Sequence, residues 1–154
     1  MLIDLVKALV FGCLAALSFG LVYELKPRLL VIAALGGGLG WLTYYVFSGP
    51  LAIAEVAAYF IATVLVSCYA ELMARLIRQP AIIFQIVGVM PMVPGQTIYD
   101  TMRALARGDS HLGLVLGLNA LNIAGAMALG ILLSSTIFRA VRMNSLAKFI
   151  KKSD

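Results

Sequence analysis

Two prolines and a glycine in the middle of an apolar run form the stretch of this sequence best suited to bind a ligand. The uncharged run 81–99 carries Pro91, Pro94 and Gly95. A proline in a helix interior removes a hydrogen bond and clashes with the preceding turn, so the two prolines predict a break in the helix. Broken helices at membrane depth often form substrate sites in transporters. A kinked packing helix is the alternative, because proline and glycine are common in membrane helices.

Three amide side chains could supply hydrogen bonds near this break. Gln85 and Gln96 flank the prolines, and Asn119 lies in the next apolar run, three residues before Asn122. Amides at membrane depth usually hold helices together across an interface. On their chemistry alone we expect Gln85, Gln96 and Asn119 to contribute to a substrate region, with helix packing as the commoner role of Asn119.

One pair of opposite charges lies next to an apolar run. Glu71 and Arg75 are four residues apart, with the acidic residue on the N-terminal side, which is the favourable arrangement for an ion pair on a helix. A structural ion pair at the membrane interface is therefore the first expectation. A carboxylate this close to the apolar region is also a candidate for proton or cation coupling.

Catalytic and metal-binding constellations are not evident in the sequence. His111 is the single histidine, and the carboxylates are scattered, so neither a nucleophile with a base nor a cluster of metal ligands stands out. Cys13 and Cys68 fall within predicted spans and are expected to be packing residues. We therefore predict that the protein is not an enzyme and that it holds no metal and no cofactor.

The elements that position these residues are membrane-spanning helices. Of the 154 residues, 62% are hydrophobic and only 12% are charged, whereas ordinary soluble domains are about 45–50% apolar. The basic residues lie at the ends of apolar runs, which indicates membrane topology and a lipid bilayer as partner, with no role for nucleic acid. We predict an all-α membrane protein that forms a single transmembrane domain over residues 1–154.

About five spans are expected, at residues 5–25, 29–47, 53–74, 81–99 and 112–138. The fourth is the broken one, and a polar connection from Asp100 to His111 follows it. The tail 139–154 should lie at the cytoplasmic surface, and its basic residues are Arg139, Arg142, Lys148, Lys151 and Lys152.

The charge pattern predicts an orientation with the N-terminus outside and the C-terminus inside. Five spans place nine of the twelve basic residues in the cytoplasm, whereas a re-entrant fourth segment with four crossings places six on each side. Five spans are also the size of one repeat in an inverted-repeat transporter. A second repeat is not found here, so we expect a different chain to supply the other half.

A set of residues in the second half of the chain matches a known pattern. These residues are Glu71, Ala74, Arg75, Pro80, Phe84, Pro91, Pro94, Gly95 and Tyr99. Together with Phe19-Gly20, Pro27-Arg28 and the run 36–42, they resemble the threonine/serine exporter (ThrE) family, specifically its C-terminal half or its small YjjB-like subunit. The resemblance extends over nearly the whole chain.

The resemblance implies a secondary-active exporter of small polar metabolites in the bacterial cytoplasmic (inner) membrane. The substrate would be threonine and serine or a dicarboxylate such as succinate, and the partner would be a larger YjjP-like subunit. It also implies that Pro91, Pro94, Gly95 and Tyr99 belong to the substrate region. Since the family is regarded as proton-driven, Glu71 gains weight as a coupling residue.

Other classes of function stay open from the sequence. A non-transporting assembly or stabilising subunit would use the glycine-rich helix faces only to dock a partner. A broken helix at the membrane midplane argues against this alternative, because a scaffold has no need of released backbone there. A channel is a further alternative, although neither a ring of charge nor a filter motif is apparent.

Overall fold

The computed structural model describes residues 2–150, and the side chains of residues 3–141. Helices account for nearly all of this part of the chain, which confirms the all-α prediction. They are α1 Leu2–Val22, α2 Pro27–Ser48, α3 Glu55–Ile77, α4 Ala81–Val89, the short 3-10 helix η1 Met90–Met92, α5 Gly95–Ala106 and α6 Ser110–Ile150.

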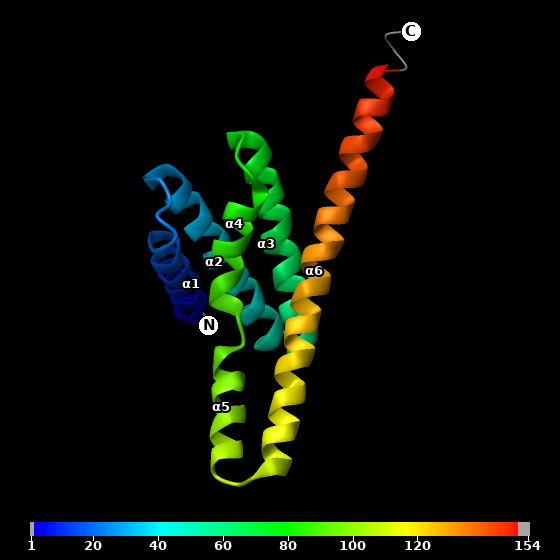
Figure 1. Ribbon diagram of the computed structural model, residues 1–154. Helices are drawn as coiled ribbons and strands as arrows, with labels where there is room; N and C mark the ends of the chain where they lie inside the picture. Colours follow the sequence, from blue (N-terminus) through cyan, green and yellow to red (C-terminus); the bar gives the residue numbers. More distant parts are fainter. Residues whose placement is uncertain (1, 151–154) are drawn as a thin grey trace.

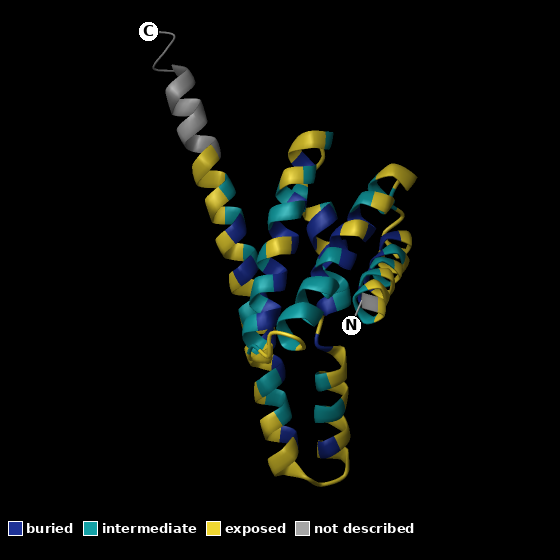
Figure 2. Ribbon diagram, turned by 180° about the vertical axis from the view of Figure 1, so that it is seen from behind, coloured by how far each residue is buried: buried dark blue, intermediate teal, exposed yellow. Residues whose placement is uncertain are grey.

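Two substructures are visible in Figure 1, a bundle and a projecting hairpin. In the bundle, α2 packs against α1, α3 and α4, and α3 packs against α6, with contacts on α6 from Asn119 to Phe138. The hairpin consists of α5 and the first half of α6, which extend beyond the end of the bundle. Figure 2 shows the buried residues concentrated in the bundle, while much of the hairpin is exposed.

Small residues bring the first two helices close together. A Cβ on Gly12 would lie 2.7 Å from the Cβ of Trp41 and 3.0 Å from the Cα of Gly38, and a Cβ on Gly37 would meet Ala16. Backbones that approach so closely gain van der Waals contact, which is the main source of helix association in lipid. The glycines of α2 thus let α1 and α2 pack closely against each other.

The buried core has two parts. Ala16, Ala33, Ala70, Ala74, Phe84 and Val87 form one cluster among α1 to α4. Tyr59, Ala62, Val66, Met92, Ile123 and Met127 form the other, where α3, η1 and α6 meet. The second cluster fixes the position of the break relative to α3 and α6, because Met92 of η1 is fully buried within it.

The predicted break is present at the predicted residues. The bend between the segment 81–92 and α5 is 48°, and α4 and α5 run in the same direction (Figure 1). Within residues 2–150, four helices are long and apolar enough to cross a membrane, and the bent pair gives a fifth if it counts as one span. Since the chain continues in one direction through the bend, the pair resembles a broken span and not a re-entrant loop.

Two boundaries differ from the sequence prediction. The predicted polar connection from Asp100 to His111 is mostly helical, because α5 continues to Ala106 and α6 begins at Ser110. Asp100, Arg103 and Arg107 line one pocket between α5 and α6, while Ile98, Met102 and Leu105 line a separate apolar groove between the same two helices. The charges therefore belong to the polar face of an amphipathic helix and do not mark a loop.

Helix α6 is also longer than the predicted span 112–138. It runs unbroken past Arg139 to Ile150, since this stretch contains neither proline nor glycine to stop it. The side chains of Arg142 and Lys148 and all of Lys151 and Lys152 lie outside the described residues, so the prediction of a basic cytoplasmic tail stays a prediction there.

Candidate functional site

The break opens onto a cavity of about 600 Å³ between α2, α3, α5 and α6, which we call the break cavity. Most of the residues predicted from the sequence meet there. Its lining residues include Pro91, Pro94, Gly95, Gln96 and Asn119, together with Trp41, Tyr44, Glu55, Tyr59, Thr97 and Asp100. Residues from four helices thus converge on one space of the size that small-molecule sites have.

The backbone at the break turns α5 toward this cavity. Val93 is extended, with ψ 129°, and Pro94 follows with φ −74° and ψ 55°. Gly95 then starts the new helix, and a Cβ at that position would meet nothing within 4 Å. The first turn of α5 therefore lies open to the cavity.

Two helix N-termini meet at the break cavity. Glu55 is the first residue of α3 and Gly95 is the first residue of α5, and neither helix has a side-chain cap. The first backbone N–H groups of a helix have no intrahelical acceptor, and the helix dipole adds partial positive charge there. Such ends favour a carboxylate group. The described residues that line the cavity include no lysine or arginine that could bind one.

Acidic and amide side chains face these helix ends. The Asn119 side-chain amide donates a hydrogen bond to Oε2 of Glu55 at 3.4 Å. Asp100 adds a second carboxylate, and aromatic rings form one wall, with centroids 4.3 Å apart between Tyr44 and Tyr59. The cavity therefore combines hydrogen-bonding groups, negative side chains and an aromatic surface.

Two of the predicted site residues lie elsewhere. Tyr99 is 65% exposed and does not line the break cavity. Gln85 is buried in the bundle, where its side-chain amide donates to Oγ of Ser67 at 3.3 Å. In the structure Gln85 thus holds α4 to α3, and a direct role of either residue in substrate binding stays a prediction.

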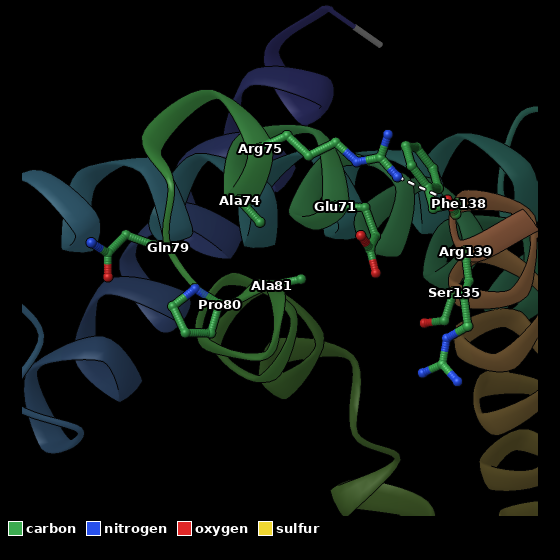
Figure 3. Close-up of a pocket in the computed structure, with 9 residues that line it drawn as sticks. All are labelled: Glu71, Ala74, Arg75, Gln79, Pro80, Ala81, Ser135, Phe138 and Arg139. Atoms are coloured by element: carbon green, nitrogen blue, oxygen red, sulfur yellow. Dashed lines mark hydrogen bonds between the residues drawn. The ribbon is translucent and has the colours of Figure 1, made fainter. Parts of the chain in front are cut away.

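A second cavity, of about 640 Å³, lies at the other end of α3, and we call it the Glu71 cavity. Figure 3 shows the Glu71 carboxylate directed into it, whereas the Arg75 guanidinium turns toward α6. Arg75 donates a hydrogen bond to the Phe138 carbonyl oxygen at 2.9 Å, and its guanidinium lies 4.8 Å from the ring centroid of Phe138. These contacts replace the expected ion pair with Glu71, because the α6 carbonyl lies within reach of Arg75.

A row of polar residues along α3 links the two ends and was missed from the sequence. The row has a spacing of four residues and consists of Glu55, Tyr59, Thr63, Ser67 and Glu71. Thr63 and Ser67 are fully buried, and Oγ1 of Thr63 has no hydrogen-bond partner among the described residues. Residues four apart follow one ridge of a helix. This spacing, inside an otherwise apolar span, was the signal that could have revealed the row.

Comparisons with known proteins agree with this arrangement. The family described as "Threonine/Serine exporter, ThrE" matches residues 8–137. A "Threonine/serine exporter" from Corynebacterium glutamicum is 30% identical over 137 residues, which are 87% of this chain and 27% of that protein. The chain thus spans about a quarter of the length of this relative. No solved structure is significantly similar to the chain. Since the family match extends over most of a chain of apolar helices, this multi-pass membrane protein belongs to the threonine/serine exporter family.

Proposed function

We propose that this chain is a subunit of a secondary-active exporter of small hydroxy amino acids, threonine and serine. The break cavity is the observation that carries the proposal, because it gathers complementary groups for each part of such a substrate. The helix ends at Glu55 and Gly95 favour its carboxylate, and the carboxylates of Glu55 and Asp100 favour its ammonium group. Amides such as Asn119 suit its hydroxyl.

A dicarboxylate such as succinate is the less favoured substrate. It would bring two negative charges next to Glu55 and Asp100, and no lysine or arginine is among the described residues that line the cavity. Like charges at close quarters in a membrane are costly. An amino acid avoids this cost, because its net charge is zero and its ammonium group can pair with a carboxylate.

The orientation we propose puts the Glu71 end of the bundle in the cytoplasm of a bacterial cell, in the inner membrane. The α1–α2 turn, the α3–α4 turn and the second half of α6 lie at this end (Figure 1). These segments carry Lys26, Arg28, Arg75, Arg78 and Arg139. Basic residues concentrate in cytoplasmic loops, so the break cavity would face the outer side.

We further propose that a larger chain, of the YjjP-like kind, packs on the projecting hairpin. An apolar groove of about 840 Å³ runs between α5 and α6 and is lined by residues such as Ile98, Met102, Leu105, Leu114, Leu118 and Leu121. The relative from Corynebacterium glutamicum is almost four times as long as its match to this chain, so it contains further sequence that could pack there. A partner of this kind would also carry the opposite repeat of an inverted pair.

An efflux assay tests this function. Cells preloaded with labelled serine, threonine or succinate would express this chain, a larger YjjP-like chain, or both. We expect efflux of serine and threonine only with both chains. Efflux with this chain alone would contradict the need for a partner, and succinate efflux would contradict the substrate class. No efflux in any combination would favour a stabilising subunit without transport activity.

A further inference from the structure

The Glu71 cavity contains two opposite charges that are not paired with each other. Among the described residues, neither the Glu71 carboxylate nor the Arg139 guanidinium has a hydrogen bond or an ion pair. Both nevertheless line the same cavity, and Figure 3 shows them directed into a common space. Charges near an apolar region are rare and tend to mark functional sites.

The neighbouring arginine does not neutralise Glu71. Arg75 is held by the Phe138 carbonyl and ring, so its guanidinium points away from the Glu71 carboxylate. Ser135, one turn before Arg139 on α6, directs its hydroxyl into the space between them (Figure 3). The cavity thus presents an anion, a hydroxyl and a cation in sequence.

We infer that the Glu71 cavity is a second binding site, for a small zwitterion that carries both an ammonium and an anionic group. Glu71 binds the ammonium group, Arg139 binds the anionic group and Ser135 hydrogen-bonds between them. An α-amino acid has this chemistry, and so does the headgroup of phosphatidylethanolamine. The amino acid as its ligand rests on the proposed function, whereas the zwitterion chemistry follows from the cavity itself.

The site is separate from the break cavity. Glu55 and Glu71 are sixteen residues apart on α3, which corresponds to about 24 Å at 1.5 Å per residue. One small amino acid cannot contact both carboxylates. The chain therefore offers one site at each end of α3, with the buried row of Thr63 and Ser67 between them.

Equilibrium binding to the purified full chain in lipid nanodiscs tests the inference. The probe is radiolabelled L-threonine, measured in a Glu55→Gln background so that the break cavity contributes little. We expect Glu71→Gln and Arg139→Gln each to weaken threonine binding at least tenfold. Glu24→Gln and Arg28→Gln, which remove the same charges outside both cavities, should leave it unchanged.

Two analogues distinguish ligand contact from a structural effect. 3-Hydroxybutyrate lacks the ammonium group, and threonine methyl ester lacks the carboxylate. Neither should compete well in the parent chain. In Glu71→Gln, 3-hydroxybutyrate should compete as well as threonine, and in Arg139→Gln the methyl ester should do so. The inference is overturned if each substitution weakens the binding of all three compounds equally. It is also overturned if the parent chain shows no saturable threonine binding.

Lipid composition separates the two sources of zwitterion. Equal threonine affinity in nanodiscs with and without phosphatidylethanolamine supports the amino acid as the ligand. Loss of threonine binding only in the phosphatidylethanolamine nanodiscs assigns the site to the headgroup and contradicts an amino acid as its ligand. Because binding is measured apart from efflux, a failed efflux assay with intact binding would contradict the proposed function and leave this site standing.

Discussion

The two ends of helix α3 carry the same acidic residue in opposite surroundings. At the break cavity, Glu55 accepts a hydrogen bond from Asn119, and among the described residues the positive potential comes from helix N-termini. At the other end, Glu71 has no such partner in the described part of the chain and shares its cavity with two arginines. The two cavities therefore differ in the positive groups that they present: helix N-termini at the break cavity, and two guanidinium groups at the Glu71 cavity.

This difference bears on how a substrate would pass along the chain. Full charges attract an ion over a longer range than dipoles do, and they are worth more where water is scarce. A guanidinium suits capture of a dilute amino acid from the cytoplasm. Helix ends and amides hold a carboxylate without a formal counter-charge, which suits its release on the far side. The asymmetry thus agrees with the direction of export that we propose.

Removing the Glu55 charge should have the largest effect on transport. In Glu55→Gln the amide oxygen can still accept from Asn119, so the fold is kept, but the ammonium partner is lost. A hydrogen bond to a charged group is worth about 1.5–3 kcal/mol, which corresponds to roughly 10- to 100-fold in affinity. We expect threonine efflux to fall by this factor.

Glu24→Gln is the matched control, because Glu24 lies in the α1–α2 turn, away from both cavities. Efflux is measured with equal amounts of each variant in the membrane. If Glu55→Gln exports threonine at the parent rate, the break cavity is not the substrate site, and the different surroundings of Glu55 and Glu71 do not explain the direction of export.

Restoring the helix at the break should have a somewhat smaller effect. Alanine at position 94 regains a backbone N–H and the α region, so α4 and α5 can join into a straighter helix. The N-terminus of α5 then no longer ends at the cavity. We expect Pro94→Ala to lower threonine efflux roughly tenfold, which is about 1.4 kcal/mol, while membrane insertion stays intact.

The control for this variant is Pro27→Ala. Pro27 begins α2 in the first helical turn, where proline breaks no helix. It should export threonine normally. An unchanged rate in Pro94→Ala would show that the exposed end of α5 contributes nothing to the site.

The break in the fourth span could be predicted from the sequence, whereas the contacts at the two ends of α3 could not. Pro91 and Pro94 act on their own backbone, so the break could be predicted from local rules. The contact between Glu55 and Asn119 could not, because it depends on how α3 and α6 align, 64 residues apart. The partner of Arg75 could not be predicted either, because Arg75 donates to the Phe138 carbonyl of α6 and does not pair with Glu71, its neighbour on α3. The effect of a residue on its own backbone could thus be predicted from the sequence, and the alignment of distant helices could not.

At the Glu71 end, the contact between Arg75 and Phe138 should contribute stability more than transport. Arg75→Gln removes a hydrogen bond from a charged group and a cation–π contact at an exposed position. We expect a loss of roughly 1–2 kcal/mol in the free energy of unfolding, seen as a lower melting temperature in detergent. Threonine efflux per folded molecule should fall less than threefold. A larger loss of efflux with unchanged stability would place Arg75 in the binding site together with Arg139.

The middle of α3 provides the smallest expected change in stability and a specific test of whether its two ends are connected. Oγ1 of Thr63 is buried without a hydrogen-bond partner among the described residues, and such a hydroxyl costs stability. Thr63→Val keeps the side-chain shape and should raise the free energy of unfolding by about 1 kcal/mol. Thr136→Val is the matched control, because the Thr136 hydroxyl donates to the Leu132 carbonyl on the exposed side of α6, and this variant should bring no such gain.

If the row on α3 carries the substrate between the cavities, Thr63→Val should also slow threonine efflux a few-fold despite the added stability. A stabler chain with unchanged efflux would mean that the two cavities are not connected through this row.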